Sequence, residues 1–179
     1  MGTALPGFDA PAVGFEQPYE MLAACHERVQ RSLALLGRLV DHLDDKGHDA
    51  QTRSAAADVL RYFDIAAPLH HQDEELHVFP LLLRREDAPL HTVVSRLQAE
   101  HREMEVLWAL VRVATLRWQE PDCKDSMNAD LRATIERFRG IYQGHIEAEE
   151  GLVFPAARAA MGAATQESMG REMQARRQT

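Results

Sequence analysis

Apolar residues recur along this chain at the spacing that amphipathic helices require. From Tyr19 to about Leu43, neighbouring apolar positions are three, four or seven residues apart. Three further stretches with helical spacing cover about residues 50–83, 90–118 and 126–161, and Gly and Pro residues separate the four. Four long helices with short connections predict an all-α fold, an antiparallel up-and-down four-helix bundle.

The segments that flank this pattern differ from it. Residues 1–17 are rich in Gly and Pro and are expected to form an extended N-terminal arm, whereas Pro18 suits the first turn of a helix. The bundle is expected to span residues 18–161. The charged C-terminal tail, residues 162–179, is expected to form a short, loosely attached fifth helix.

Three prolines fall inside the predicted helices. Pro68 removes a backbone donor and should kink or restart the second helix. Pro80 and Pro155 occupy matching places late in the second and fourth helices, where each is expected to end or bend its helix. The sequence leaves open whether these two prolines also have a positional role.

Composition narrows the class of protein. The 179 residues fit one domain with its own core. The net charge of -8 argues against nucleic-acid binding, and no apolar run approaches the roughly 20 residues that span a bilayer. Cys25 and Cys123 offer neither a disulfide framework nor a thiolate metal site. We therefore expect a cytoplasmic protein without nucleic-acid or membrane partners.

The chain carries an internal repeat with a constant offset of 75 residues. Each half has a lone His, then a His-x3-Glu pair, then a Phe-Pro pair. The first half contributes His26, Phe63, His70, Glu74, Glu75, Val78, Phe79 and Pro80, and the second half contributes His101, Phe138, His145, Glu149, Glu150, Val153, Phe154 and Pro155. Such a repeat predicts two similar helical hairpins that face each other.

Four His and two Glu of this repeat are candidate metal ligands. Residues four apart lie on one helix face, so each His-x3-Glu pair can direct two donors at one place. Imidazole suits iron, copper, nickel or zinc, and a carboxylate can bridge two cations. Burying six such groups without partners would be costly. The predicted ligands of a dinuclear site are His26, His70, Glu74, His101, His145 and Glu149.

A second register competes with this one, because His71 and Glu75 are also four residues apart. The repeat excludes it by aligning His71 with Ile146, which cannot bind a metal ion. Glu75 and Glu150 turn about 100 degrees from the ligand face and are expected to act around the ligands or on the helix surface. His77 is expected to pack near the site or to lie around the ligands.

The stretches HHQDEELHVFP and HIEAEEGLVFP, preceded by CHERV and EHREM, resemble the hemerythrin-like, or HHE cation-binding, domain family. The resemblance covers about residues 17–160. It implies a four-helix bundle around a non-haem di-iron centre, with two iron ions as the cofactor and the six residues above as ligands. Zinc and manganese are the alternative metals.

The sequence departs from the oxygen carriers of that family in two places. Their third helix has two His four residues apart, whereas here His101 is followed by Glu105. Their last carboxylate ligand is an Asp five residues after a His, whereas here Glu149 lies four after His145 and Glu150 takes the fifth place. Reversible oxygen transport is therefore in doubt. Either Glu105 supplies an additional ligand or that coordination position stays open.

Three functions fit these observations. The leading one is a module that binds or senses oxygen, nitric oxide or iron status, with a small diatomic ligand or oxidant as its partner. The second is a di-iron enzyme that acts on peroxide or oxygen, and the third is a protein whose metal, such as zinc, is mainly structural. No catalytic residue is assigned, and a homodimer is left open.

Overall fold

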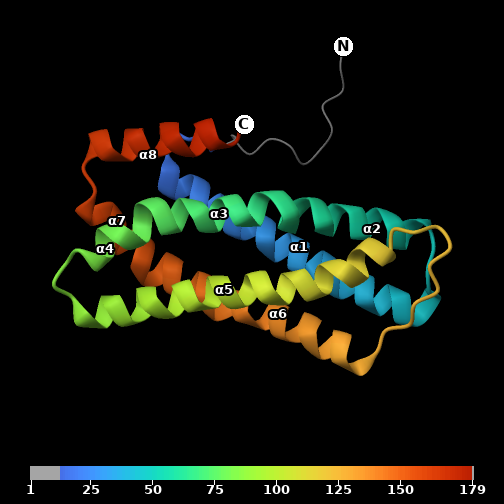
Figure 1. Ribbon diagram of the computed structural model, residues 1–179. Helices are drawn as coiled ribbons and strands as arrows, with labels where there is room; N and C mark the ends of the chain where they lie inside the picture. Colours follow the sequence, from blue (N-terminus) through green and yellow to red (C-terminus); the bar gives the residue numbers. More distant parts are fainter. Residues whose placement is uncertain (1–12, 179) are drawn as a thin grey trace, which may run out of the picture.

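The computed structural model describes residues 13–178, and this part of the chain contains helices and no strand (Figure 1). The α-helices are joined in places by π-helical turns, labelled η. The elements are α1 (Pro18–Lys46), α2 (Ala50–Arg61), η1 (Tyr62–Ala66), α3 (Ala67–Asp73), η2 (Glu74–Val78), α4 (Phe79–Leu83), α5 (Ala88–Arg117), α6 (Ala129–Ala148), η3 (Glu149–Val153), α7 (Phe154–Ala160) and α8 (Ala163–Arg176).

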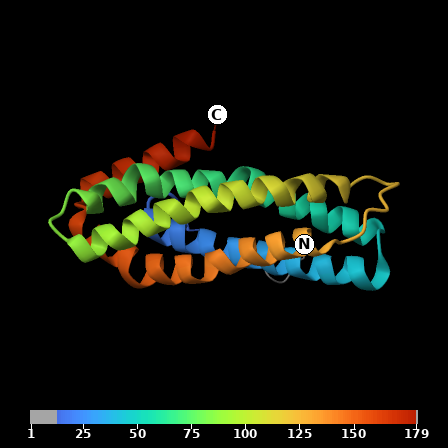
Figure 2. The ribbon, with the colours of Figure 1, turned by 60° about the horizontal axis from the view of Figure 1, so that its bottom comes forward.

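Four helical rods lie along the length of the molecule (Figures 1 and 2). The first is α1, the second is the continuous stretch from α2 to α4, the third is α5, and the fourth runs from α6 to α7. The first rod packs on the second through α1 and α2, and the third packs on the fourth through α5 and α6. Contacts of α2 and α4 with α5 join the two pairs. Successive rods run in opposite directions, so the predicted all-α bundle is confirmed.

Capping side chains fix three of the helix starts. Asp49 accepts a hydrogen bond from the backbone N–H of Thr52, whose hydroxyl in turn accepts from the backbone N–H of Asp49. Asp87 and Asn128 cap α5 and α6 by accepting from the backbone N–H three residues ahead. The fourth rod therefore begins at Ala129, slightly later than predicted, because Asn128 is its cap.

Pro68, Pro80 and Pro155 do not end their rods. Each follows a π-helical turn, and the residue before each proline donates its N–H to the carbonyl five residues back. These bonds run from Ala67 to Tyr62, from Phe79 to Glu74 and from Phe154 to Glu149. The extra residue widens the turn where the proline ring would otherwise clash with the preceding carbonyl. The rods thus continue through the prolines, and the expectation that the helices could end there is wrong.

The core consists of two apolar clusters with polar residues of the repeat between them. The first cluster contains Phe63 and Phe138 and reaches the end of the bundle where α1 meets α2. The second contains Phe79 and Phe154 and reaches the end where α4 meets α5. In α1, His26 follows residues of the second cluster and precedes residues of the first. The two clusters therefore shield the middle of the bundle from water on both sides.

Helix α8 packs beside α1 and is more firmly attached than the sequence predicts (Figure 1). Met169 and Met173 are buried in the second apolar cluster. Arg176 and Arg177 both donate to the fully buried carboxylate of Asp73 in α3. The sequence suggested a loose tail because this segment is charged. Two of its charged residues instead pair with a buried carboxylate, and these charge-assisted hydrogen bonds hold α8 in place.

Residues 13–17 are the described part of the predicted N-terminal arm, and residues 1–12 lie outside the described part. Here Phe15 passes close to α8. A Cβ atom at Gly170 would come within 1.8 Å of the carbonyl oxygen of Phe15, so this approach requires glycine. The guanidinium of Arg177 lies 5.2 Å from the centre of the Phe15 ring, which adds a cation–π contact.

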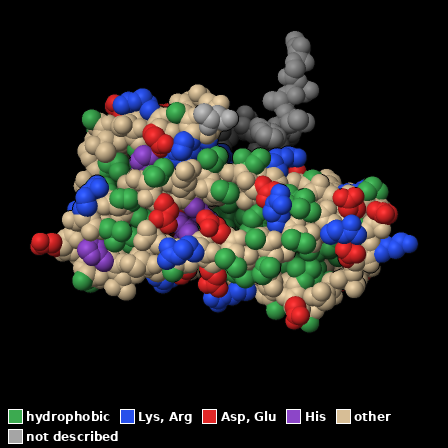
Figure 3. All heavy atoms as spheres, in the orientation of Figure 1, with side chains coloured by type: hydrophobic (Ala, Val, Ile, Leu, Met, Phe, Trp, Pro, Cys, Tyr) green, Lys and Arg blue, Asp and Glu red, His purple; other side chains and the backbone are tan. Residues whose placement is uncertain are grey.

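Hydrophobic, acidic and basic side chains are interspersed on the face shown in Figure 3. Within the described residues, none of the helices combines the length and the apolar character needed to cross a membrane.

Candidate metal centre

The six candidate ligands converge in the middle of the bundle, between the two apolar clusters. Each rod contributes, because the lone histidines stand on the first and third rods and the His-x3-Glu pairs on the second and fourth. All six residues are at most 5% exposed. The residues are His26, His70, Glu74, His101, His145 and Glu149.

Their donor atoms form two overlapping sets. His26 and His70 join both glutamates in what we call the first donor group, and His101 and His145 join the same two glutamates in the second donor group. Within each group, all donor atoms lie within 4.8 Å of one another. The shared residues are Glu74 and Glu149. Each group is compact enough to surround one cation.

The two shared carboxylates each present one oxygen to each donor group. The distances are 3.3 Å from Glu74 Oε1 to His70 Nε2, 3.4 Å from Glu74 Oε2 to His101 Nε2, 3.1 Å from Glu149 Oε2 to His26 Nε2, and 3.0 Å from Glu149 Oε1 to His145 Nε2. A carboxylate placed in this way suits a bridge between two cations. The imidazole Nε2 atoms face the same centre.

The centre contains buried polar atoms that the protein itself leaves unsatisfied. All four carboxylate oxygens of Glu74 and Glu149, and Nε2 of His26, lack a hydrogen-bond partner. Burial of one such group without a partner costs roughly 1–3 kcal/mol. Cations bound to the donor groups would coordinate these atoms. Imidazole nitrogen and carboxylate oxygen, without thiolate, form a donor set that suits transition-metal ions, so the residues present fit a pair of metal ions.

The two carboxylates of the centre titrate as a coupled pair. Burial and the facing carboxylate of Glu149 raise the pKa of Glu74 well above its usual range. Burial also opposes ionisation of Glu149, but the facing imidazoles of His145 and His26 outweigh it and lower the pKa of Glu149. Glu149 is therefore the more acidic of the two carboxyl groups.

Three further glutamates hold the outer edges of three imidazoles. The distances are 2.8 Å from His26 Nδ1 to Glu150 Oε1, 3.0 Å from His101 Nδ1 to Glu75 Oε1, and 2.9 Å from His145 Nδ1 to Glu100 Oε2. An Nδ1–H that donates to a carboxylate leaves Nε2 free to bind a metal ion, and it raises the basicity of the ring. Glu75 and Glu150 thus lie around the ligands, as expected. Glu100 was missed in the sequence.

The fourth imidazole, that of His70, has no carboxylate at its Nδ1. The internal repeat differs between the two halves at the position that would supply it. Nδ1 of His70 is buried and has no hydrogen bond. Glu100, which holds His145, aligns in the repeat with Cys25. Burial raises the pKa of the Cys25 thiol, so this position carries no charge. The second donor group therefore has two outer carboxylates and the first has one.

Three other residues that the sequence analysis considered as ligands or as neighbours of the ligands lie outside both donor groups. His71 is buried but stacks on the ring of His101, with centroids 4.1 Å apart. Glu105 is exposed and belongs to neither group. His77 faces α8, where its Nε2 lies 2.5 Å from a carboxylate oxygen of Glu172.

A small cavity of about 40 Å³ lies beside the second donor group. His71 borders it, and the other lining residues are Phe63, Ala67, Pro68, Met104, Glu105, Trp108 and Tyr142. Most of these side chains are apolar or aromatic. The space is large enough for one water molecule or a molecule of similar size.

Comparison with known proteins agrees with this geometry. Residues 17–157 match the model of the hemerythrin HHE cation binding domain. An uncharacterized protein of Haemophilus influenzae is 36% identical over 165 residues, which cover 92% of this chain and 92% of that protein. The match spans all four rods and every residue of the two donor groups. The chain therefore belongs to the hemerythrin HHE cation-binding domain family.

Proposed function

We propose that this protein holds a non-haem di-iron centre and uses it to bind or sense a small diatomic molecule, oxygen or nitric oxide, or the supply of iron itself. The observation that carries the proposal is the pair of shared carboxylates, Glu74 and Glu149, each with one oxygen toward each donor group. Iron in such a site supplies a coordination position and an exchangeable electron.

The surrounding residues have separate tasks in this proposal. The outer carboxylates of Glu75, Glu100 and Glu150 orient three imidazoles. The apolar clusters on either side exclude water. The cavity beside the second donor group offers room for a diatomic molecule. Because Glu105 is exposed and outside the donor groups, we infer that it leaves a coordination position open instead of filling it.

Rapid mixing of the reduced, iron-loaded protein with oxygen tests this function. We expect a rapid change of the absorption spectrum that is not reversed when oxygen is removed, because Glu105 stands where the oxygen carriers of the family have a second His on the third helix. The control is Glu74→Ala, which removes a ligand from both groups and should abolish the response. A spectrum that returns fully to that of the reduced protein would restore the oxygen-transport interpretation, and an unchanged spectrum would contradict sensing.

A structural zinc site is the second candidate. Each donor group offers four ligands, which is the number that zinc takes in structural sites. Zinc would stabilise the bundle but would leave the absorption spectrum indifferent to oxygen and nitric oxide. Competition between iron and zinc for the metal-free protein, followed by exposure to nitric oxide, separates the two candidates.

A further inference from the structure

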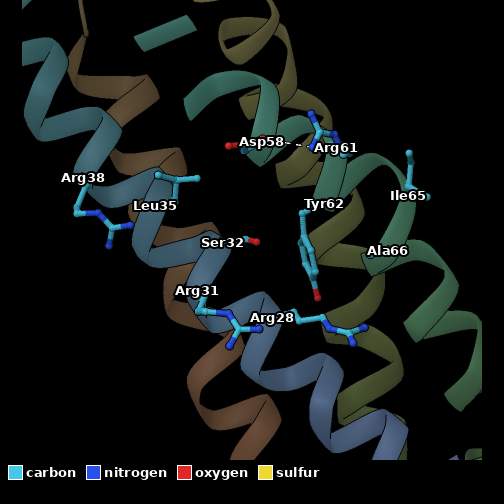
Figure 4. Close-up of a pocket in the computed structure, with 10 residues that line it drawn as sticks. All are labelled: Arg28, Arg31, Ser32, Leu35, Arg38, Asp58, Arg61, Tyr62, Ile65 and Ala66. Carbon is cyan, nitrogen blue, oxygen red and sulfur yellow. Dashed lines mark ion pairs between the residues drawn. The ribbon is translucent and has the colours of Figure 1, made fainter. Parts of the chain in front are cut away.

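An open groove of about 650 Å³ runs between α1 and the stretch formed by α2 and η1 (Figure 4). None of the six candidate metal ligands lines it. Small-molecule sites commonly have volumes of about 300–1,000 Å³. The size of the groove therefore suits a ligand distinct from the metal ions.

Arginines form the rim of this groove. Arg28, Arg31 and Arg38 come from α1, and Arg61 comes from α2. The lining contains one acidic side chain, that of Asp58, which lies 3.4 Å from Arg61 and forms an ion pair with it. Three of the four cations thus remain for an occupant.

These three arginines are weakly paired or unpaired. Arg28 and Arg38 make no hydrogen bond or ion pair with the described residues. Arg31 lies 4.0 Å from Glu27, and both side chains are at least 70% exposed, so the pair contributes little. Since the whole chain has 28 acidic and 20 basic residues, the groove reverses the overall charge locally. An anionic occupant would complement it.

The floor of the groove is apolar. It includes Leu35, Ala66 and the ring of Tyr62, and Ile65 at its edge is 59% exposed. The hydroxyl of Tyr62 donates to the carbonyl of Cys25 at 3.2 Å. Because the hydroxyl already has a hydrogen-bond partner, Tyr62 would contact a ligand through its aromatic ring.

The cations are concentrated at one end. Arg28 and Arg31 are neighbours on one face of α1, and Figure 4 shows them at the same end of the groove as the hydroxyl of Tyr62. Arg38 lies seven residues beyond Arg31, about 10 Å along the helix axis, past Leu35. A charged head would be held by the two neighbouring arginines, with an apolar body along Leu35.

We propose that this groove binds an amphipathic anion, with a carboxylate or phosphate head at Arg28 and Arg31 and an alkyl or aryl body on the floor formed by Leu35, Tyr62 and Ile65. The positive charges of the two arginines favour an anionic head group, and the exposed apolar floor favours an alkyl or aryl group attached to it. Binding at this site does not depend on the identity of the metal.

Calorimetric titration of the metal-loaded protein with octanoate, octyl phosphate and octanol tests the proposal. Both anions should bind one to one, and octanol should bind about tenfold more weakly or worse, because it lacks the charge. The double variant Arg28→Gln and Arg31→Gln should weaken octanoate binding by about tenfold or more. Arg85→Gln, an exposed arginine outside the groove, is the matched control and should leave the affinity unchanged.

A second variant tests the floor without touching the arginines. Ile65→Asp places a carboxylate at the exposed edge and should also weaken both anions. The proposal is overturned if neither anion shows saturable binding to the wild-type protein, if the double variant and the control bind alike, or if inorganic phosphate binds as tightly as octyl phosphate. Binding of a poly-glutamate peptide with no binding of either amphiphile would assign the groove to a protein partner and would equally overturn it.

Discussion

Replacement of Glu100 by Gln should weaken metal binding at the second donor group. Glu100 lies 2.9 Å from Nδ1 of His145 and is 19% exposed. The amide oxygen of Gln can still accept the hydrogen bond, so the variant removes the negative charge and keeps the shape. Its contact with Arg96 is on the surface at 3.1 Å and contributes little. The change in metal affinity therefore measures the contribution of the negative charge of Glu100 alone.

The expected size follows from the strength of hydrogen bonds. A bond to a charged group contributes about 1.5–3 kcal/mol and a neutral one about 0.5–1.5 kcal/mol. The difference is roughly 1–1.5 kcal/mol, or about a tenfold weaker affinity. Removal of both charge and bond in Glu100→Leu should reach the upper end of the 10- to 100-fold range that is usual around metal ligands.

Solvent screening predicts an order among the three outer carboxylates. Glu75 is 34% exposed and Glu150 is 49% exposed, so their Gln variants should weaken metal binding less than Glu100→Gln does. The assay is anaerobic competition for iron(II) with a coloured chelator. Glu103→Gln is the control, because Glu103 lies on the same helix but pairs with Arg137 instead of an imidazole. Equal affinities for the Glu100 and Glu103 variants would refute the reasoning, as would a largest effect at Glu150.

Alanine at His70 should lower the bound metal, whereas alanine at His71 should leave it nearly unchanged, because only His70 belongs to a donor group; elemental analysis decides, and the opposite order would reverse the register. A chelator should lower the melting temperature by several degrees, because ions that bind only the folded state stabilise it, and coincident melts would contradict a metal-stabilised core. Replacement of Arg177 by Ala should lower the free energy of unfolding by about 1.5–3 kcal/mol in urea, because it removes charged bonds to the buried Asp73; an unchanged midpoint would show that α8 is loosely attached. Asp49 caps α2, and the hydrogen bond that its carboxylate accepts from the backbone N–H of Thr52 lowers the pKa of Asp49 to about 2, below its unfolded value of about 3.9. The stabilisation is therefore complete above the unfolded value and is lost as the pH falls toward 2. Asp49→Ala should therefore melt below the wild type at pH 6, with a smaller difference at pH 3, and a difference independent of pH would contradict this.

The repeat carried most of what the sequence could predict. It placed six residues on inward faces, and the structure brings all six together. It also aligned Glu75 with Glu150, which hold two imidazoles in equivalent ways. Glu100 escaped notice for the same reason, because its repeat partner is Cys25 and no pairing drew attention to it.

Other features depend on tertiary structure that periodicity does not reveal. The π-helical turns before the prolines were not foreseen, because a proline in a helical pattern indicates a break when local geometry is considered alone. The attachment of α8 depends on the buried Asp73, which lies about a hundred residues away and looks like an ordinary surface acid in the sequence. The arginine-rimmed groove likewise requires two helices to be placed side by side.

The most direct test of the central claim is metal analysis of the protein purified without added metal, together with an absorption spectrum recorded in air. We predict about two iron ions per chain, because the two donor groups share Glu74 and Glu149, and a charge-transfer band of the kind that oxygen-bridged ferric ions give. One metal ion per chain would contradict the bridged pair. Stoichiometric zinc without such a band would contradict the di-iron function.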